Sequence, residues 1–277
     1  MREPYMLDPG YWVAPLRTPT LPPASATNTA IVGKRKLAVL EPATPHPDEQ
    51  GRLLAMLDER VADGAQVEAI LITHHHSDHI GFAQALAERT GAPILAHRET
   101  ARRVSMTVDR HITSDTLVEL DAGHALRPVF TPGHAPGHLV FLDTATGIVH
   151  AGDMVAGEGS ILIDPDDGGD MSAYLASLER LAALGASRLV PAHGGVFDEP
   201  EAVCRHFVEH RLGREGKVLA AIGTESKALP EILASAYADT PKMLWPLAEK
   251  SLRAHLSKLV TDGRVLQDET GARRVET

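Results

Sequence analysis

The 277-residue chain contains one cysteine, few aromatic residues and no long apolar run. A single cysteine, Cys204, excludes an internal disulfide and a cage of several thiolates, which suits a reducing compartment. No stretch of 18 or more apolar residues occurs, so the sequence predicts no membrane span. The first 30 residues lack a basic stretch followed by an apolar run. We therefore expect no secretory signal and a cytoplasmic location.

Positive charge is also scarce, and its shortage is uneven along the chain. Residues 1–200 hold 15 Lys and Arg against 26 Asp and Glu, whereas residues 201–277 hold 12 against 11. An acidic body repels phosphate backbones at long range, although bound metal ions would reverse that sign locally. A nucleic-acid-binding region usually has a clear basic excess, and residues 201–277 have almost none.

The order of the expected elements predicts a layered α/β domain followed by a helical region. Residues 1–27 are rich in proline and predict an extended lead-in. Short apolar strands then alternate with helical patterns, and residues with metal-binding side chains follow several strand ends. The expected strands are 29–32, 37–40, 69–72, 94–96, 127–131, 139–142, 148–150 and 188–191, and the expected helices are 48–62, 80–90 and 172–184.

The pattern changes after about residue 200. Three helical patterns at 200–222, 228–238 and 243–261 precede two short strand-like pieces at 265–267 and 272–275. Helices followed by a terminal hairpin are typical of a winged helix. We therefore predict two domains, residues 1–200 and residues 201–277.

The strongest chemical signal is the sequence His74-x-His76-x-Asp78-His79. Residues two apart in a loop that leaves a strand can project the same way, so His74 and His76 can reach one ion together. Asp78 and His79 lie where the next helix begins and can turn toward a second ion. Zinc takes imidazole nitrogen and carboxylate oxygen, with one position left for water when the site is catalytic.

Three further candidates stand alone at strand ends: His134, Asp153 and His193. Each has an ordinary alternative, because a single histidine is more often a hydrogen-bonded structural residue and Asp153 can be a turn residue. Asp78 can simply cap a helix, and a histidine-rich run can be a surface site or a tag remnant. This run is internal and interrupted by Ser77 and Asp78. Because several residues with metal-binding side chains occur together in this sequence, we favour a metal centre over these alternatives.

The motifs at 73–79 (THHHSDH), 131–134 (TPGH), 151–153 (AGD) and 191–194 (PAHG) resemble the ordered ligand motifs of the metallo-β-lactamase superfamily. The resemblance covers roughly residues 25–200 and implies an αββα sandwich. The usual early Asp-Thr-Gly segment is replaced here by Glu41-Pro42-Ala43, which affects the support of the site. The implied ligands are His74, His76 and His134 for one ion, Asp78, His79 and His193 for a second, and Asp153 for both, with His75 a non-ligand.

The bridging role of Asp153 also has an independent rationale. Only a carboxylate offers two oxygens to two cations about 3.5–4 Å apart. Two zinc ions, two aspartates and a bridging hydroxide leave about one positive charge, which can stabilise an oxyanion. We expect two zinc ions per chain and a metal-bridging hydroxide that attacks an ester or thioester carbonyl, as in glyoxalase II-like chemistry. Asp78 is the expected catalytic residue, because it can orient the nucleophile.

Later segments resemble the β-lactamase-like protein 2 group and its C-terminal winged helix. They are 169–174 (GDMSAY), 206–213 (HFVEHRLG) and 252–260 (LRAHLSKLV). Some members of that group act as endoribonucleases on single-stranded RNA, and related fungal enzymes are thioesterases that release acyl chains from carrier proteins. An alternative for residues 201–277 is a packing domain that roofs the active-site cleft.

Several functions therefore stay open. A small acyl substrate suits the acidic surface, whereas the winged helix favours RNA and a single-strand endoribonuclease. Lactonase or β-lactamase activity shares the same residues, but β-lactam-cleaving members generally lack the full Asp78 and Asp153 set. Iron-dependent persulfide dioxygenases use this scaffold too. Flavodiiron proteins have Glu where this chain has His76. A non-enzymatic regulator is the remaining class, and oligomeric state stays open.

Overall fold

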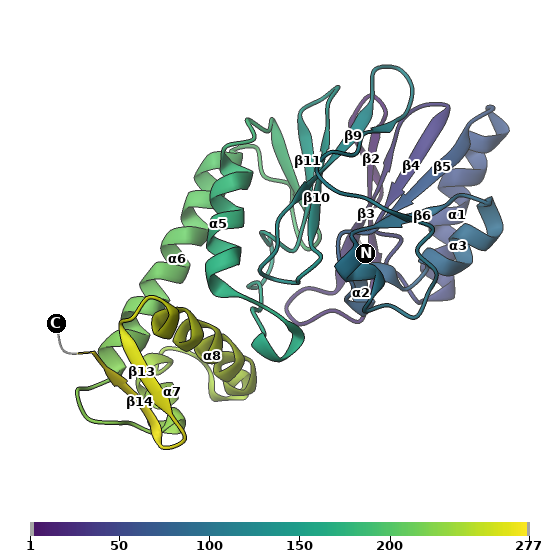
Figure 1. Cartoon of the computed structure of the whole chain (residues 1–277). Coiled ribbons are helices and arrows are strands. Elements are labelled where there is room, and N and C mark those ends of the chain that lie inside the picture. The colour runs from purple at the N-terminus through teal and green to yellow at the C-terminus, as the bar shows by residue number, and fades with distance from the viewer. Residues whose placement is uncertain (1–2, 276–277) are drawn as a thin grey trace.

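Two β-sheets stacked face to face form the core of the N-terminal part of the molecule (Figure 1). The computed structural model describes residues 3–275. Over that range the first sheet has the strand order β1-β2-β3-β4-β5-β6-β7, and the second has the order β12-β11-β10-β9-β8.

The first sheet changes from antiparallel to parallel at β4. Neighbours from β1 to β4 are antiparallel, and neighbours from β4 to β7 are parallel. Helices α1 (Pro47–Ala62), α3 (Ala83–Thr90) and the short α4 (Arg98–Ala101) lie in the three crossovers between parallel strands. The strands are β1 (Tyr5–Asp8), β2 (Tyr11–Arg17), β3 (Ala26–Val32), β4 (Lys36–Leu40), β5 (Gln66–Leu71), β6 (Ile94–Ala96) and β7 (Arg110–His111).

The second sheet brings three strand ends to one edge. Strand β10 is antiparallel to both β9 and β11, and β12 is parallel to β11, so β9, β11 and β12 run the same way. Helix α5 (Met171–Ala182) lies between β11 and β12 in the chain. The strands are β8 (Val118–Glu119), β9 (Ala125–Phe130), β10 (Leu139–Asp143), β11 (Ile148–Gly152) and β12 (Arg188–Pro191).

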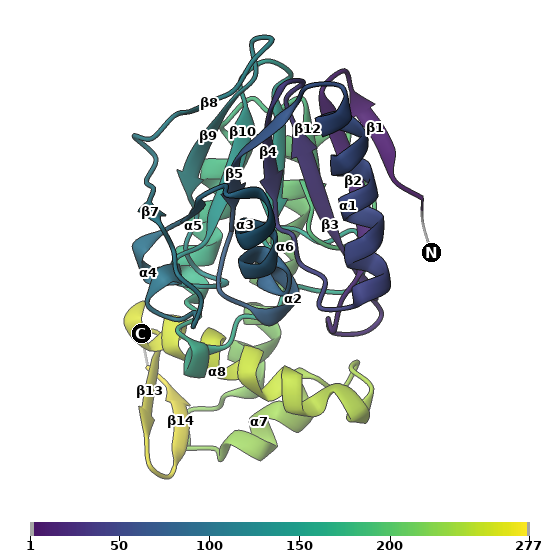
Figure 2. The ribbon, with the colours of Figure 1, turned by 90° about the vertical axis from the view of Figure 1, so that its right-hand side faces the viewer.

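Three buried apolar clusters define the layers. Leu53 of α1 packs in one cluster with Ile70 on the outer face of the first sheet. Leu71 and Phe141 belong to a second cluster that fills the space between the sheets. Leu178 of α5 lies in a third cluster on the outer face of the second sheet. Burial of each such large apolar side chain stabilises the folded state by about 1.5–3 kcal/mol. The order helix, sheet, sheet, helix confirms the predicted αββα sandwich, and Figure 2 shows α1 and α3 in front of the first sheet.

Helix α6 (Pro200–Ala221) connects the sandwich to the C-terminal region (Figure 1). Cys204 near its start is buried in the α5 cluster, whereas Val218 near its end is buried in a separate C-terminal cluster. That cluster also holds side chains of α7 (Leu229–Ala236), α8 (Trp245–Thr261), β13 (Val265–Asp268) and β14 (Gly271–Arg274). The helices and the terminal hairpin confirm the predicted winged-helix region. Helix α6 begins at Pro200 and buries side chains in both cores, and the division into residues 1–200 and 201–277 stays a prediction.

The N-terminal segment differs from the predicted lead-in, because it adds β1 and β2 to the first sheet. Proline is tolerated in β2 because β1 pairs only with residues 11–13, so Pro15 lies where β2 has no neighbour on that side. The predicted helix at 80–90 is divided into α2 (Ser77–Ile80) and α3. Within residues 3–275, no helix is long and apolar enough to cross a membrane.

Gly133 is required by the close approach of the Thr-Pro-Gly-His turn to α5. Its φ is +133°, and an added Cβ would lie 2.2 Å from the backbone nitrogen of Tyr174. We predict that Gly133→Ala lowers the free energy of unfolding by about 2–3 kcal/mol or more, measured by urea titration. Gly64→Ala is the control, since its φ is +89° but the added Cβ meets nothing within 4 Å. Equal losses for the two variants would contradict this explanation.

Cys204 is fully buried, and burial raises the pKa of its thiol to about 12. At pH 8 only about one thiol in ten thousand is then ionised, and the thiolate is the reactive form. We predict that Ellman's reagent leaves the native protein unmodified at pH 8 and modifies one thiol per chain in 8 M urea. Rapid reaction of the native protein would show that α6 does not cover this side chain.

Candidate metal centre

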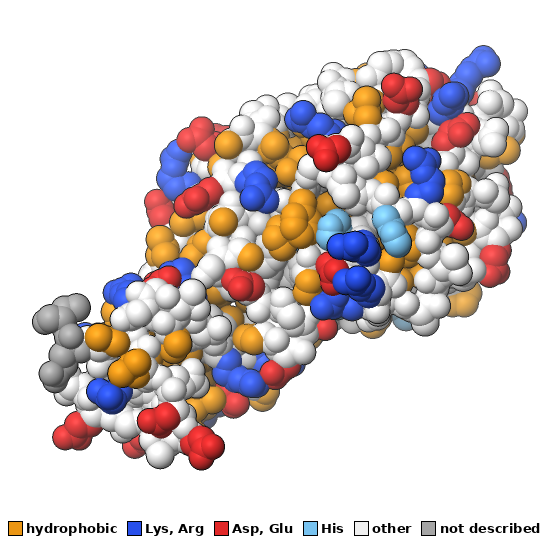
Figure 3. Space-filling model, viewed as in Figure 1, with side chains coloured by type: hydrophobic (Ala, Val, Ile, Leu, Met, Phe, Trp, Pro, Cys, Tyr) orange, Lys and Arg blue, Asp and Glu red, His pale blue; other side chains and the backbone are white. Residues whose placement is uncertain are grey.

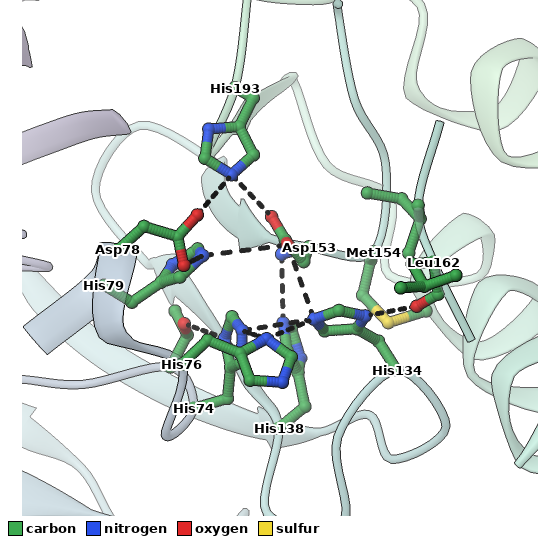
Figure 4. Close-up of polar contacts among 12 residues, drawn as sticks. His74, His76, Asp78, His79, His134, His138, Asp153, Met154, Leu162 and His193 are labelled. Atoms are coloured by element: carbon green, nitrogen blue, oxygen red, sulfur yellow. Dashed lines mark hydrogen bonds and ion pairs between the residues drawn. The ribbon is translucent and has the colours of Figure 1, made fainter. Parts of the chain in front are cut away.

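The candidate ligands converge because they follow strand ends at one edge of the sandwich. His74 and His76 lie in the loop after β5, and Asp78 and His79 lie on α2. The other three follow β9, β11 and β12, which end at the same edge: His134, Asp153 and His193. Figure 4 shows the seven side chains turned toward one another around Asp153.

Three imidazole rings form the first cluster. The Nε2 atom of His74 lies 2.9 Å from Nδ1 of His76, and Nε2 of His134 lies 3.2 Å and 3.0 Å from those two atoms. Asp153 Oδ2 lies 3.4 Å from His134 Nε2. Zinc–nitrogen bonds of about 2.0–2.1 Å in a tetrahedral site need ligand atoms spaced much as these are.

Two rings and a carboxylate form the second cluster. Asp78 Oδ1 lies 3.6 Å from His79 Nε2, and Asp78 Oδ2 lies 3.6 Å from His193 Nε2. Asp153 Oδ1 lies 3.5 Å from His193 Nε2, and its Oδ2 lies 3.7 Å from His79 Nε2 of this cluster and 3.4 Å from His134 Nε2 of the first cluster. Its carboxylate therefore lies between the two clusters, as a bridging ligand must.

Each of the five rings has its other nitrogen fixed by a hydrogen bond. Carbonyl and carboxylate oxygens only accept, so the ring nitrogens that face them donate a proton. Thr73 donates its hydroxyl proton to Glu41, so its oxygen accepts from His74. The pairs are His74 Nδ1 with Thr73 Oγ1 (2.9 Å), His76 Nε2 with Asp167 Oδ2 (2.7 Å), His79 Nδ1 with Glu41 Oε1 (2.7 Å), His134 Nδ1 with Leu162 O (2.8 Å) and His193 Nδ1 with Ala26 O (2.9 Å).

The inward nitrogens of these rings face the carboxylates of Asp78 and Asp153. Burial lowers the pKa of His134 to about 4, despite the opposing effect of Asp153, and burial also lowers the pKa of His74. Burial by itself also lowers the pKa of His79. The carboxylates of Glu41, Asp153 and Asp78 outweigh this effect and raise the pKa well above the ordinary value. The second cluster thus attracts a cation even when the only one available is a proton.

Metal ions fit this arrangement. Two buried inward atoms, Nε2 of His79 and Oδ1 of Asp153, have no hydrogen-bond partner among the described residues. Buried polar atoms without partners are costly, and a coordinated cation removes that cost. Four groups of ligand atoms lie within 4.8 Å of one another among the described residues, and two of them together contain all seven candidates: His74, His76, His134 and Asp153, and Asp78, His79 and His193.

Glu41 is identified from the sequence only as a departure from the usual Asp-Thr-Gly segment. The side chain is fully buried, and it accepts hydrogen bonds from His79 and from His150 Nε2 at 2.8 Å. Burial alone would raise its pKa, but the two rings hold the pKa well below its usual range. Glu41 follows β4 just as His74 follows β5, and this shared position was the signal that could have revealed its role.

His138 and Asp167 were not predicted. His138 Nδ1 bonds to Thr131 Oγ1, and its Nε2 accepts the backbone N–H of Asp153 at 3.1 Å. Burial lowers the pKa of His138 to about 3, which keeps the ring neutral and able to accept. Asp167 bonds to His75 and His76. A second histidine four residues after Thr-Pro-Gly-His was a detectable signal, whereas the Asp167 contact depends entirely on tertiary structure.

The metallo-beta-lactamase superfamily model matches residues 22–193, which contain all seven candidate ligands. The chain belongs to this superfamily. A model of the beta-lactamase associated winged helix domain matches residues 229–274. Membership in the superfamily makes the protein a metal-dependent hydrolase, and its His and Asp clusters are candidates to hold the metal.

Similar proteins match along most of the chain. A beta-lactamase-like protein 2 homolog from Drosophila melanogaster is 28% identical over 256 residues, covering 86% of this chain and 84% of the relative. Lactamase-like protein adaB from Aspergillus niger is 29% identical over 253 residues, covering 86% and 76%. A metallo-beta-lactamase family protein of known structure from Thermus thermophilus has a TM-score of 0.78 at 24% identity, covering 98% of this chain and all of that one. This structural likeness supports the superfamily fold.

The two clusters should lose metal independently. We predict that His76→Ala or His134→Ala removes about one zinc equivalent from the first cluster, and His193→Ala about one from the second. Each change should lower turnover by more than about a hundredfold, because an ion supplies several kcal/mol of transition-state stabilisation. Metal content is measured by plasma mass spectrometry after gel filtration. His111→Ala, at an exposed histidine, is the control. Unchanged zinc content with retained turnover in the ligand variants would contradict the ligand assignment.

Proposed function

We propose that this chain is a binuclear zinc hydrolase of a small ester or thioester. The observation that carries the proposal is a cavity of about 580 Å³ that has the candidate ligands on one side and the C-terminal region on the other. Cavities of this size hold small organic molecules. Imidazole and carboxylate ligands suit zinc. We propose two ions per chain and, from the sequence, a cytoplasmic location.

The cavity suits an acyl group because much of its lining is apolar. Leu21 and its neighbouring prolines come from the loop between β2 and β3, and Ile161 comes from the loop after β11. Leu244 and Leu247 come from the C-terminal region. His76, Asp78, His134, Asp153 and His193 line the same cavity. An acyl chain on the apolar lining would place its carbonyl carbon at the candidate metal centre.

The reaction proposed is the addition of water to the carbonyl carbon, followed by loss of the alcohol or thiol. Bound zinc ions lower the pKa of coordinated water toward about 7 and stabilise negative charge on the carbonyl oxygen. Asp78 lines the cavity, and its backbone carbonyl accepts a hydrogen bond from Thr27 Oγ1 at 2.8 Å. Its carboxylate would accept a hydrogen bond from the attacking water and orient it. The proton lost by the water leaves on the departing oxygen or sulfur.

Endoribonuclease activity is the second candidate because of the winged helix. Several basic side chains of the C-terminal region are already paired with carboxylates of the same chain, which leaves less positive charge for a phosphate backbone. The pairs are Arg205 with Glu201, Arg214 and Lys217 with Asp239, Lys250 with Asp164, Arg253 with Asp166, and Lys258 and Arg264 with Glu215. On the face drawn in Figure 3, positive and negative side chains are interspersed over both parts of the molecule.

A substrate panel on protein of known metal content tests the proposal. We predict about two zinc ions per chain and a kcat/KM for acyl thioesters at least about a hundredfold above that for single-stranded RNA, a lactone or a β-lactam. Cleavage of RNA with resistant thioesters would replace the proposal by the endoribonuclease. One iron per chain with oxygen-dependent chemistry would replace it by an oxidoreductase such as a persulfide dioxygenase.

The cavity predicts a dependence on acyl length. Leu247→Trp should fill the part of the cavity that the C-terminal region lines, where a long acyl chain would lie. We therefore expect kcat/KM to fall at least about tenfold for an octanoyl thioester and little for an acetyl thioester. Leu266→Trp is the matched control, because that leucine is 49% exposed on the terminal hairpin and does not line the cavity. An equal loss for both chain lengths would show that the apolar lining does not hold the acyl group.

A further inference from the structure

A short acidic segment joins the candidate metal centre to the C-terminal region. The one-turn helix η1 (Pro165–Asp167) and the preceding Asp164 form this segment. On one side, Asp167 Oδ2 lies 2.7 Å from Nε2 of His76 and 3.1 Å from Nε2 of His75. The segment therefore touches a candidate metal ligand directly.

The other side of the segment is held by α8. Lys250 Nζ lies 2.6 Å from Asp164 Oδ2, and Arg253 Nη1 lies 2.6 Å from Asp166 Oδ2. Lys250 and Arg253 are three residues apart on a helix and so project from the same face. The Asp164 side chain also caps η1 by accepting the backbone N–H of Asp166. Two ion pairs thus connect α8 to the segment that carries Asp167.

His76 needs such support more than the other candidate ligands. Its side chain is 29% exposed, whereas those of His79, His134 and His193 are at most 7% exposed. Packing on all sides restrains a buried ring, but a partly exposed ring depends on its hydrogen bonds. His76 also presents Nδ1 to the first cluster, where His74 and His134 present Nε2. With Nδ1 facing the cluster, the ring carries its N–H at Nε2, and Asp167 Oδ2 accepts the hydrogen bond from this N–H.

We propose that Asp167 is a positioning residue that fixes the ring orientation and the tautomer of His76, and that Lys250 and Arg253 hold Asp167 in place. The C-terminal region thereby completes the first cluster of the metal centre, in addition to lining the cavity. Outer partners of this kind typically change metal affinity or activity 10–100-fold when they are removed. The proposal rests on the proposed role of His76 as a metal ligand.

Zinc affinity, measured by competition with a chromophoric chelator, tests the role of Asp167. Asp167→Ala should weaken one zinc site at least about tenfold and change the visible spectrum of the cobalt-substituted protein. Asp167→Asn keeps an oxygen acceptor for His76 and should recover most of the affinity. Asp198→Ala removes an exposed carboxylate paired with Arg188 and is the control. Wild-type affinity and an unchanged cobalt spectrum in Asp167→Ala would overturn the proposal.

A double-mutant cycle tests the contribution of α8. Lys250→Met combined with Arg253→Met should weaken the same zinc site severalfold, and should add little in the Asp167→Ala background because the effect acts through Asp167. Arg205→Met, which removes an exposed ion pair on α6, should leave zinc affinity unchanged. Full additivity, or no effect of the α8 changes, would overturn the role of the C-terminal region.

The same titration separates this proposal from the proposed function. Two tight zinc sites in the wild type that are unaffected by Asp167→Ala would overturn this proposal and leave the hydrolase intact. No zinc binding by the wild type would overturn both. A third zinc equivalent that disappears in Asp167→Ala would show that Asp167 with His75 and His76 is itself a ligand group, and would also overturn the positioning role.

Discussion

The metal centre depends on one constraint: five imidazole rings each turn one nitrogen into the same small space, beside two carboxylates. Lone pairs and carboxylates crowded together in a buried site repel one another and lack partners unless a cation lies among them. The tautomers are fixed from outside, because each ring donates its other N–H to a fixed acceptor. The arrangement is therefore prepared for metal ions by hydrogen bonds that do not involve the ions.

These outer acceptors connect the site to distant parts of the fold. Glu41 follows β4, Leu162 belongs to the loop after β11, and Ala26 begins β3. Asp167 belongs to the segment that α8 holds. The sandwich fixes the ligands at one edge because parallel strands end there, while loops and the C-terminal region fix the orientation of the rings. The winged-helix region thus reaches the candidate metal centre through the segment that carries Asp167.

Much of the fold and the set of candidate ligands could be predicted from short contiguous patterns. The run from His74 to His79 is informative by itself, and the lone candidates at strand ends gain meaning from their order. The strands β1 and β2 were missed because prolines obscure the strand pattern, although edge positions tolerate them. The supporting residues Asp167 and His138 were missed for another reason. Their roles are defined by contacts across 91 and 15 positions of sequence, which no local pattern records.

The central claim is that two cations share the space between these side chains. Anomalous scattering from a crystal of the zinc-loaded protein, measured on both sides of the zinc absorption edge, tests it most directly. We predict two zinc peaks about 3.5–4 Å apart, one bonded to Nε2 of His74 and His134 and the other to Nε2 of His79 and His193. A single peak, or peaks located away from these nitrogens, would contradict the account.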